Sequence, residues 1–276
     1  MAIVFLNGRY LQEKEAKLSI HDVGFLYGEA IYETLRTVEG QLMNIDGHLE
    51  RLQQSALFLG IPLPPIEKIK GWLQRTVDRN GFWKKGKESR VRLTVSGGVH
   101  SFNDSSSKAT MLIVVVPLVE VVPALRSRGI SVVTYPIQRP LPHIKTNNLA
   151  ATLAARRYMK THKAEEVLLV DHQGEVTEGS ISNLFIVKRG RLITPKTSML
   201  GGTTRTRIVD LARGHRWKLK QRSISYKDLL RADEVFICNA PRGVVPVVKV
   251  DGKRVSDGKV GVITKKVWEV LKENWS

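Results

Sequence analysis

Apolar residues recur with two different spacings along the first 116 residues, which predicts a mixed α+β region. Residues 3–6 are apolar and precede Asn7-Gly8, a strong signal for a two-residue β-hairpin turn. From 46 to 60 the apolar residues have helical spacing, so we expect a helix with Asp46 as its N-cap and Gly60 at its end. A second helix is predicted over 66–81, and strands are predicted over 91–95 and 111–116.

The rest of the chain has short apolar runs typical of strands, interrupted by three helical patterns. Strands are predicted over 130–135, 167–170, 181–187, 192–194 and 235–238, and a hairpin is predicted over 247–255 with Asp251-Gly252 at its tip. Helices are predicted over 148–162, 204–213 and 260–274. Segment 117–128 has two prolines and no amphipathic face, so we interpret it as a connector. We therefore expect a small N-terminal α+β domain (1–116) and a larger, β-rich C-terminal domain (129–276).

The composition is that of a globular protein. Of the 276 residues, 42% are hydrophobic and 25% are charged, which is enough apolar side chain to bury a core. The most apolar segment, 109–119, is much shorter than the roughly 20 residues that a membrane span needs. The N-terminus lacks the basic start and the small-residue cleavage site of a signal peptide. We expect a cytoplasmic protein with no membrane partner.

The cysteine and histidine content argues against a disulfide and against a metal site. The single cysteine, Cys238, has no partner for an intramolecular disulfide and cannot form the thiolate clusters of structural zinc sites. The seven histidines show no ligand spacing. We expect no bound metal.

The chain is strongly basic, since 44 Lys and Arg residues stand against 26 Asp and Glu residues and give a formal charge of +18. Such a charge favours polyanions. The basic residues are, however, spread over several small groups without an aromatic platform or zinc-finger spacing. We therefore interpret them as the lysine-rich surface of an enzyme suited to anionic small molecules or to high temperature, and we expect no nucleic-acid partner.

Residues 81–87 match the spacing of a phosphate-binding P-loop but not its chemistry. Glu88 follows where a Ser or Thr must contact magnesium, and the bulky Phe82 and Trp83 occupy a loop that must wrap closely around phosphate. The stretch also ends a predicted helix, whereas a P-loop begins one. We interpret it as a basic turn.

Three segments of the second half carry residue types that suit one cofactor. Lys145 follows the apolar stretch 140–142, and apolar surroundings favour the neutral, nucleophilic form of a lysine amine. Glu178 lies in a turn rich in Gly and Ser, and a buried carboxylate there needs a cation such as the protonated ring nitrogen of pyridoxal phosphate. Gly201-Gly202 and Thr203-Thr204 open a helix and form an anion site from amides, hydroxyls and the helix dipole. Taken alone, each has an ordinary alternative: a surface lysine, a turn acid and a capped helix.

The order of these segments resembles the fold type IV pyridoxal-phosphate enzymes. The lysine of HIKTNN is followed 33 residues later by the glutamate of TEGSISNLF, and then by GGTTR and DEVFICNA. HDVGFLYGEAIYETLR and DGHLERL are similar to the family's N-terminal segments, so the resemblance covers essentially the whole chain. Members include D-amino-acid and branched-chain aminotransferases, amine transaminases and aminodeoxychorismate lyase. The resemblance implies a two-domain α/β (α+β) fold, pyridoxal 5′-phosphate as cofactor and a homodimer.

The resemblance also implies roles for individual residues. Those that match the family's cofactor contacts are Arg51, Lys145, Glu178, Thr203, Thr204, Asn239 and Ala240. Lys145 matches the lysine that bonds to the cofactor aldehyde and then moves the proton of the substrate Cα. Glu178 matches the carboxylate that keeps the ring nitrogen protonated. Arg51 matches a phosphate ligand, while Ala240 offers only its backbone where some members have a hydroxyl.

Three residues match the substrate side of the family's site, each with an alternative. Tyr32 matches an aromatic that lines this side, or is a core tyrosine of the small sheet. Arg92 matches a pocket arginine of branched-chain members, or faces solvent by strand alternation. Arg242 is a candidate partner for a substrate carboxylate, or is a solvent-facing loop arginine. The loop 97–107 lacks the arginine that familiar D-amino-acid members carry there.

We therefore expect an aminotransferase that moves an amino group between an amino acid, of the D-amino-acid or branched-chain type, and a 2-oxo acid by a ping-pong mechanism. Aminodeoxychorismate lyase, which eliminates pyruvate, is the alternative within the family. A non-enzymatic basic binding protein is the alternative outside it.

Overall fold

The computed structural model describes residues 2–104, 108–119 and 123–274. The chain divides into two compact units. The first unit is Met1–Val119 together with Ile144–Asn148, and the second is Glu120–His143 together with Leu149–Ser276. The division after Val119 falls inside the predicted connector.

The segment that carries Lys145 belongs to the first unit, whereas the sequence-based division assigned it to the C-terminal domain. The reason is backbone pairing with a strand of the first unit. Tyr32 N donates to Lys145 O at 2.9 Å, and Asn147 N donates to Ala30 O at 2.8 Å. A local pattern does not show such a return of the chain.

The first unit contains an antiparallel sheet with the strand order β2-β1-β6-β5-β3-β4. Its strands are β1 (Ile3–Leu6), β2 (Arg9–Gln12), β3 (Ala30–Val38), β4 (Gln41–Leu42), β5 (Ser89–Ser96) and β6 (Thr110–Pro117). The predicted hairpin is confirmed: β1 and β2 are joined by Asn7 (φ 48°) and Gly8 (φ 91°), both in the left-handed region that a tight turn of this kind requires.

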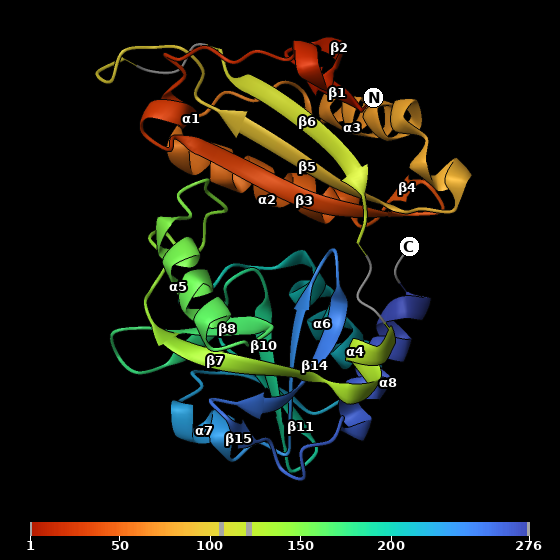
Figure 1. Ribbon diagram of the computed structural model, residues 1–276, viewed down its shortest axis with the longest axis vertical. Helices are drawn as coiled ribbons and strands as arrows, with labels where there is room; N and C mark the ends of the chain where they lie inside the picture. Colours follow the sequence, from red (N-terminus) through yellow and green to blue (C-terminus); the bar gives the residue numbers. More distant parts are fainter. Residues whose placement is uncertain (1, 105–107, 120–122, 275–276) are drawn as a thin grey trace. The chain divides into compact units, whose positions relative to one another are not determined.

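Two 15-residue helices cover one face of this sheet (Figure 1). They are α2 (Ile45–Leu59) and α3 (Ile66–Asn80), accompanied by the short α1 (Val23–Leu26) and by the 3₁₀ turns η1 (Glu13–Glu15) and η2 (Phe82–Lys85). Gly60 and Gly81 end the two long helices with positive φ, as predicted. The prediction of Asp46 as N-cap is wrong. Asn44 takes that position, and Asp46 lies in the first turn, where its charge still complements the helix dipole.

The core of the first unit lies between the two helices and the sheet. Alternate residues of β5, namely Val91, Leu93 and Val95, are fully buried against apolar side chains of α2 and α3. The residues between them, Arg92 and Thr94, therefore point to the opposite face. This face of the sheet carries the first group of candidate residues.

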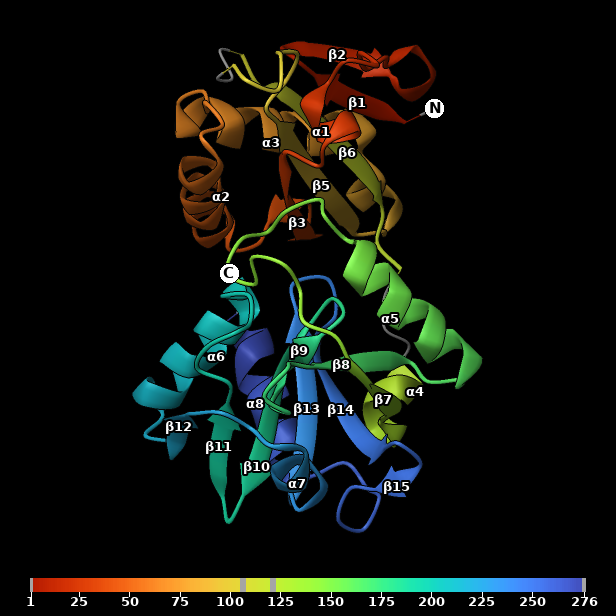
Figure 2. The ribbon, with the colours of Figure 1, turned by 90° about the vertical axis from the view of Figure 1, so that its left-hand side faces the viewer.

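The second unit contains a mixed sheet with the order β12-β11-β10-β13-β14-β7-β8-β9. Its strands are β7 (Ile130–Pro136), β8 (Glu166–Val170), β9 (Val176–Gly179), β10 (Asn183–Lys188), β11 (Arg191–Thr194), β12 (Leu219–Gln221), β13 (Glu234–Asn239), β14 (Gly243–Val250) and β15 (Lys253–Arg254). Figure 2 shows β13 between β10 and β14. The strand β9 pairs with both β8 and β10, and β15 pairs with β14.

Five helices accompany this sheet in the described part of the chain: α4 (Pro123–Arg128), α5 (Ala150–Thr161), α6 (Thr203–Gly214), α7 (Tyr226–Leu230) and α8 (Val262–Glu273). Helices α6 and α8 pack on one face against Phe185 and Phe236, whose rings stack at 4.9 Å. The interpretation of 117–128 as a connector without an element is wrong in part, because α4 forms there; residues 120–122 lie outside the described residues. The mixture of helices and strands confirms the predicted fold class.

Neither a membrane span nor a metal cluster is found in the parts of the chain that the structure describes. No helix among these residues is long and apolar enough to cross a bilayer. No group of three or more His, Cys, Asp or Glu side chains among them is arranged to hold a metal ion.

Candidate active site

The first group of candidate residues surrounds Lys145 on the face of the sheet away from α2 and α3. The half-buried Lys145 lies between the buried Ile144 and Thr146. Its Nζ is 4.5 Å from the centroid of the Tyr32 ring. The backbone bond from Tyr32 to Lys145 holds the two residues together. An amine fixed against an aromatic face keeps a defined direction, which a nucleophile requires.

Arg92 completes this group. Its guanidinium lies 3.9 Å from the centroid of the Tyr32 ring, and its Nη2 donates to Asn147 Oδ1 at 2.9 Å. Burial lowers the pKa of Arg92. Arg92 therefore does not extend into solvent. Tyr32 is half-buried and lies outside the core cluster, so it is not a core tyrosine. Its ring contacts both Arg92 and Lys145, and the structure therefore brings these three predicted residues together.

Behind Lys145, on the core side of β3, a buried charge cluster joins this strand to α2. Glu33 is 1% exposed and receives two bonds from Arg51, from Nε at 2.8 Å and from Nη2 at 2.6 Å. The Nδ1 of His48 lies 2.6 Å from the same carboxylate, and because ionised Glu33 only accepts, this nitrogen donates. Sequence reasoning identified Arg51 but missed Glu33 and His48. An acid on the buried face of a strand and a histidine three residues before an arginine on a helix were the available signals.

Opposing effects set the pKa values in this cluster. Burial alone would raise the pKa of Glu33, but the charges and hydrogen bonds of Arg51 and His48 outweigh it and lower the pKa to about 2. Burial lowers the pKa of His48 and outweighs the Glu33 carboxylate, which alone would raise it; the positive charges of Arg51 and Lys145 add smaller lowering effects. The cluster therefore holds an ionised Glu33 and a neutral His48 near pH 7.

We expect this cluster to make stability depend on acid. The pKa of Glu33 is about 2 when folded against an ordinary value of 4.5, so its contribution is complete above pH 4.5 and is lost as the pH falls toward 2. The shift corresponds to about 3 kcal/mol. Urea unfolding should be measured at several pH values between 4.5 and 2. As the pH falls over this range, the free energy of unfolding of the wild type should decrease by about 3 kcal/mol more than that of Glu33→Gln. The control Glu50→Gln, which removes an exposed carboxylate of α2, should lose stability in parallel with the wild type. Parallel loss in Glu33→Gln would contradict the assignment.

The sequence pattern predicted that Glu178 lies in a turn. This prediction is wrong, because Glu178 lies in strand β9 of the second unit. It is 4% exposed. Its Oε1 accepts from Arg139 Nε at 2.7 Å and its Oε2 accepts from Leu200 N at 3.0 Å. Arg139 also donates to Pro142 O at 2.7 Å. An ionised carboxylate has about four acceptor positions, so the two bonds leave room for a further N–H donor such as a ring nitrogen. Sequence reasoning missed Arg139, which precedes Lys145 by six residues.

The GGTTR segment starts α6. Gly202 is the N-cap, and the first intrahelical bond is that from Thr206 N to Gly202 O at 2.9 Å. The amides of the first turn therefore precede the helical ladder and lie at its positive end. Thr203 and Thr204 are each 7% exposed. Hydroxyls and amides at the start of a 12-residue helix fit a phosphate group, so the donor set matches the cofactor that the sequence implies.

The two glycines before this helix provide a matched test. A Cβ on Gly202 would lie 1.8 Å from Asn183 Oδ1, whereas a Cβ on Gly201 meets nothing within 4 Å. Asn183 cannot easily yield, because its Nδ2 donates to Leu200 O at 2.8 Å. We expect Gly202→Ala to lower the free energy of unfolding by about 1–3 kcal/mol and to weaken cofactor binding. Gly201→Ala should stay within about 0.5 kcal/mol of the wild type, and equal effects in the two variants would contradict this packing argument.

The predicted phosphate-side turn is the β13–β14 connection. The Oδ1 of Asn239 accepts from Arg242 N at 2.8 Å, and its Nδ2 donates to Ile181 O at 3.1 Å. Arg242 O accepts from Arg126 Nη2 at 2.9 Å. The Asn239 side chain thus holds the turn in shape, and the half-buried Ala240 contributes backbone.

Comparison with known proteins agrees with this chemistry. The family model for class IV amino-transferases matches residues 30–250. The chain is 33% identical to a putative branched-chain-amino-acid aminotransferase of Methanocaldococcus jannaschii, over 98% of this chain and 95% of that protein. It is 30% identical to a D-alanine aminotransferase of Staphylococcus epidermidis, over 97% and 95%. The solved branched-chain aminotransferase of Thermoproteus uzoniensis with norvaline has a TM-score of 0.89 and 26% identity, covering 99% of this chain and 94% of its own.

The family model matches most of the chain, and relatives that are 30% or more identical over nearly their whole length are named aminotransferases. Pyridoxal 5′-phosphate is the cofactor of this family. The chain therefore belongs to the class IV aminotransferases.

Proposed function

We propose that the protein transfers an amino group between an amino acid, of the D-amino-acid or branched-chain type, and a 2-oxo acid in two half-reactions. The observation that carries this proposal is the buried Glu178, held by Arg139 and by the Leu200 amide as a fixed anion with acceptor capacity left. The named relatives are aminotransferases, which favours transamination over the lyase reaction.

We propose that one set of residues acts on the cofactor ring and its aldehyde and that a second set binds the cofactor phosphate. When bound, pyridoxal 5′-phosphate supplies an aldehyde that accepts the amino group and a ring that stores the electron pair left at the substrate Cα. Lys145 Nζ would carry the proton from the substrate Cα to the cofactor carbon C4′ in the first half-reaction, and from C4′ to Cα in the second. Glu178 would hold the proton on the ring nitrogen, and Arg139 orients the Glu178 carboxylate through the bond from its Nε. The α6 amides with Thr203 and Thr204 are proposed to bind the phosphate. Asn239, Ala240 and Arg51 are further phosphate contacts that the family resemblance implies, and within the first unit Arg51 is bonded to Glu33.

A panel of D- and L-amino acids, each paired with 2-oxoglutarate or pyruvate, tests the proposal. We expect ping-pong kinetics, seen as parallel double-reciprocal plots, and a change of the cofactor absorbance when an amino donor is added without an acceptor. The same panel identifies the configuration and side chain of the preferred donor. Elimination of pyruvate from an aminodeoxychorismate with no transfer to any 2-oxo acid would overturn the proposal in favour of the lyase reaction.

Two arginines are proposed as anchors for the substrate carboxylate, and the geometry favours Arg92. Arg92 stacks on Tyr32, which also contacts Lys145, so all three lie together in the first unit. We expect Arg92→Gln to raise KM for amino acids by about one to three decades, the order expected for a lost charge-assisted pair, and to spare amines that lack a carboxylate. Arg242→Gln is the matched comparison. A larger effect on amino acids from Arg242→Gln would transfer the role to that residue.

We also propose that the protein forms a homodimer through an apolar face of the first unit. Ile20, Phe25 and Phe102 are each more than 70% exposed, and Tyr27 packs edge-on against Phe102 at 5.1 Å. Several large exposed apolar side chains in one place indicate an interface. Light scattering should give about twice the chain mass of 31.0 kDa. Phe25→Asp with Phe102→Asp should shift the mass to that of one chain, and an unshifted dimer would place the interface elsewhere.

A further inference from the structure

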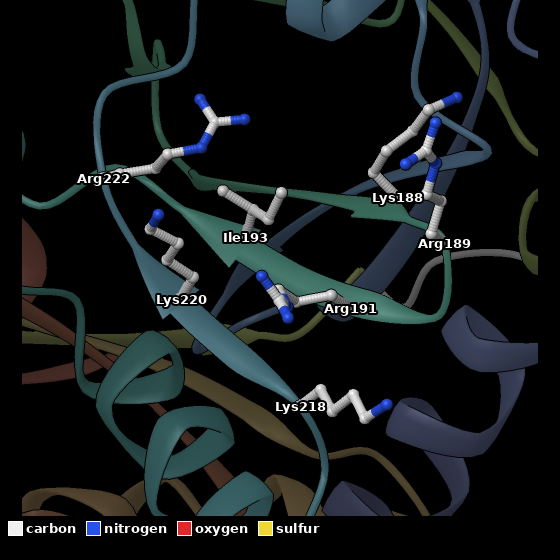
Figure 3. A pocket seen from close by; sticks show the side chains of 7 residues that line it. All are labelled: Lys188, Arg189, Arg191, Ile193, Lys218, Lys220 and Arg222. Atoms are coloured by element: carbon white, nitrogen blue, oxygen red, sulfur yellow. The ribbon is translucent and has the colours of Figure 1, made fainter.

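A pocket of about 480 Å³ lies on the sheet of the second unit at its β11–β12 edge (Figure 3). Its lining consists of one apolar residue, Ile193, and six basic residues. The basic residues are Lys188, Arg189, Arg191, Lys218, Lys220 and Arg222. Figure 3 shows their side chains arranged around Ile193. The transamination chemistry proposed above uses none of them.

Strand pairing explains why these charges converge. Lys188 lies opposite Arg191 across the β10–β11 hairpin, and Ile193 lies opposite Lys220 in the parallel β11–β12 pair. Residues directly opposite each other project to the same face, and so do residues two apart along a strand. Lys218 and Arg222 therefore flank Lys220 on this face. Two stretches of chain that are 25 or more residues apart thus build one basic surface.

The acids near the pocket do not balance its charge. Lys188 pairs with Asp233 at 2.7 Å, and Arg222 pairs with Asp228 at 2.7 Å. Glu175 acts on Arg222 from farther away. Six bases less three acids leave a local charge of +3.

Four of the basic side chains make no hydrogen bond or ion pair with any residue that the structure describes: those of Arg189, Arg191, Lys218 and Lys220. Arg189 is bonded only through its backbone N–H, which donates to Asp233 Oδ2. Lysines on an edge strand discourage pairing with another sheet, which accounts for charges on β12 itself. Protection of the sheet edge does not account for Arg189, which lies in the β10–β11 turn, or for Arg191, which begins β11. Like charges gathered in a concave site raise its positive potential and concentrate anions there.

The lining also restricts the class of anion. It contains no aromatic side chain on which a base could stack, so a ligand is recognised by its charge. Guanidinium groups bind phosphate with two parallel bonds, and lysines add point charges. A volume of this size matches a small molecule and not the extended track of a nucleic acid. We propose that the pocket binds a small polyanion with linked phosphate groups, either an inorganic polyphosphate or the phosphate chain of a nucleotide.

This site is separate from the proposed cofactor contacts. Glu178 pairs with Asn183, which begins β10, whereas Lys188 ends the same strand. Six residues of extended strand separate these two ends by roughly 17 Å. Failure of the proposed transaminase activity would therefore leave the pocket proposal standing, and the reverse also holds.

Calorimetric titration of the holoenzyme, freed of excess cofactor, with inorganic tripolyphosphate tests the proposal. We expect saturable binding that weakens at least about 30-fold in the triple variant Arg191→Gln, Lys218→Gln, Lys220→Gln, because three charge-assisted contacts are lost. The control variant changes the same number of charges on α8, by Lys265→Gln, Lys266→Gln and Lys272→Gln, and should bind as the wild type does. The pocket variant should fold at least as well as the wild type, because it removes repulsion between like charges. Thermal unfolding without anion checks this.

Other outcomes would overturn the proposal. The absence of saturable tripolyphosphate binding would do so, as would an equal loss in the α8 variant, which would show general surface attraction. Adenosine triphosphate serves as a second probe, and similar affinities for both probes support recognition of the phosphate chain. If adenosine triphosphate binds and tripolyphosphate does not, the pocket recognises the base, which would contradict recognition of the phosphate chain. A single-stranded oligonucleotide that binds through these residues more tightly than tripolyphosphate would identify a nucleic-acid site instead.

Discussion

Lys145→Ala is expected to purify folded and to lose transamination by roughly 10⁴-fold or more, since the variant lacks both the nucleophile and the proton carrier. The substitution removes a half-buried side chain that packs against the Tyr32 ring, while the backbone bonds that fix the segment to β3 remain. Its stability should therefore be close to that of the wild type.

Chemical mapping identifies the lysine without relying on rates. Borohydride reduction of the holoenzyme followed by peptide mapping should find a pyridoxyl group on Lys145, and Lys145→Ala should show none. Lys160→Ala, on the exposed side of α5, is the matched control and should keep both the label and the rate. A pyridoxyl group on another lysine of the wild type would refute the assignment.

Glu178→Gln is expected to bind the cofactor and to transaminate at least 100-fold more slowly. A neutral amide cannot hold the ring nitrogen's proton with a full charge, and the expected loss corresponds to about 3 kcal/mol of electrostatic stabilisation. The amide is nearly the same size as the carboxylate, and its oxygen can still accept from the Leu200 amide. The effect should therefore fall on kcat, with little change in cofactor affinity.

Two further variants separate the role of Glu178 from general effects of charge. Arg139→Gln removes the guanidinium that orients Glu178, and it should lower kcat less than Glu178→Gln because the carboxylate remains. Glu165→Gln removes a carboxylate that pairs with Arg128 at the surface, and its rate should equal that of the wild type. Wild-type turnover in Glu178→Gln would remove this residue from the mechanism.

Elements whose formation depends on residues close together along the chain were predicted well from the sequence pattern alone. The Asn7-Gly8 hairpin and the helices ended by Gly60 and Gly81 follow from turn geometry and from 3.6-residue periodicity, which are local properties. The strand β3 was missed because its sequence lacks the regular apolar alternation of a half-buried strand. Its buried face carries Glu33 beside Leu35, and a charged residue there breaks the alternation that marks a strand.

The sequence by itself determined which chemistry the chain carries, since the order of the lysine, glutamate and GGTTR segments is a property of the chain that folding does not alter. Only the tertiary structure decided how these residues are held. Lys145 joins the first unit through backbone bonds to β3, and Glu178 finds its cation in Arg139, which is 39 residues away. The six bases around Ile193 form one pocket only after β11 and β12 pair. These contacts depend on strand register and on long-range burial, so the spacing of residues along the chain does not reveal them.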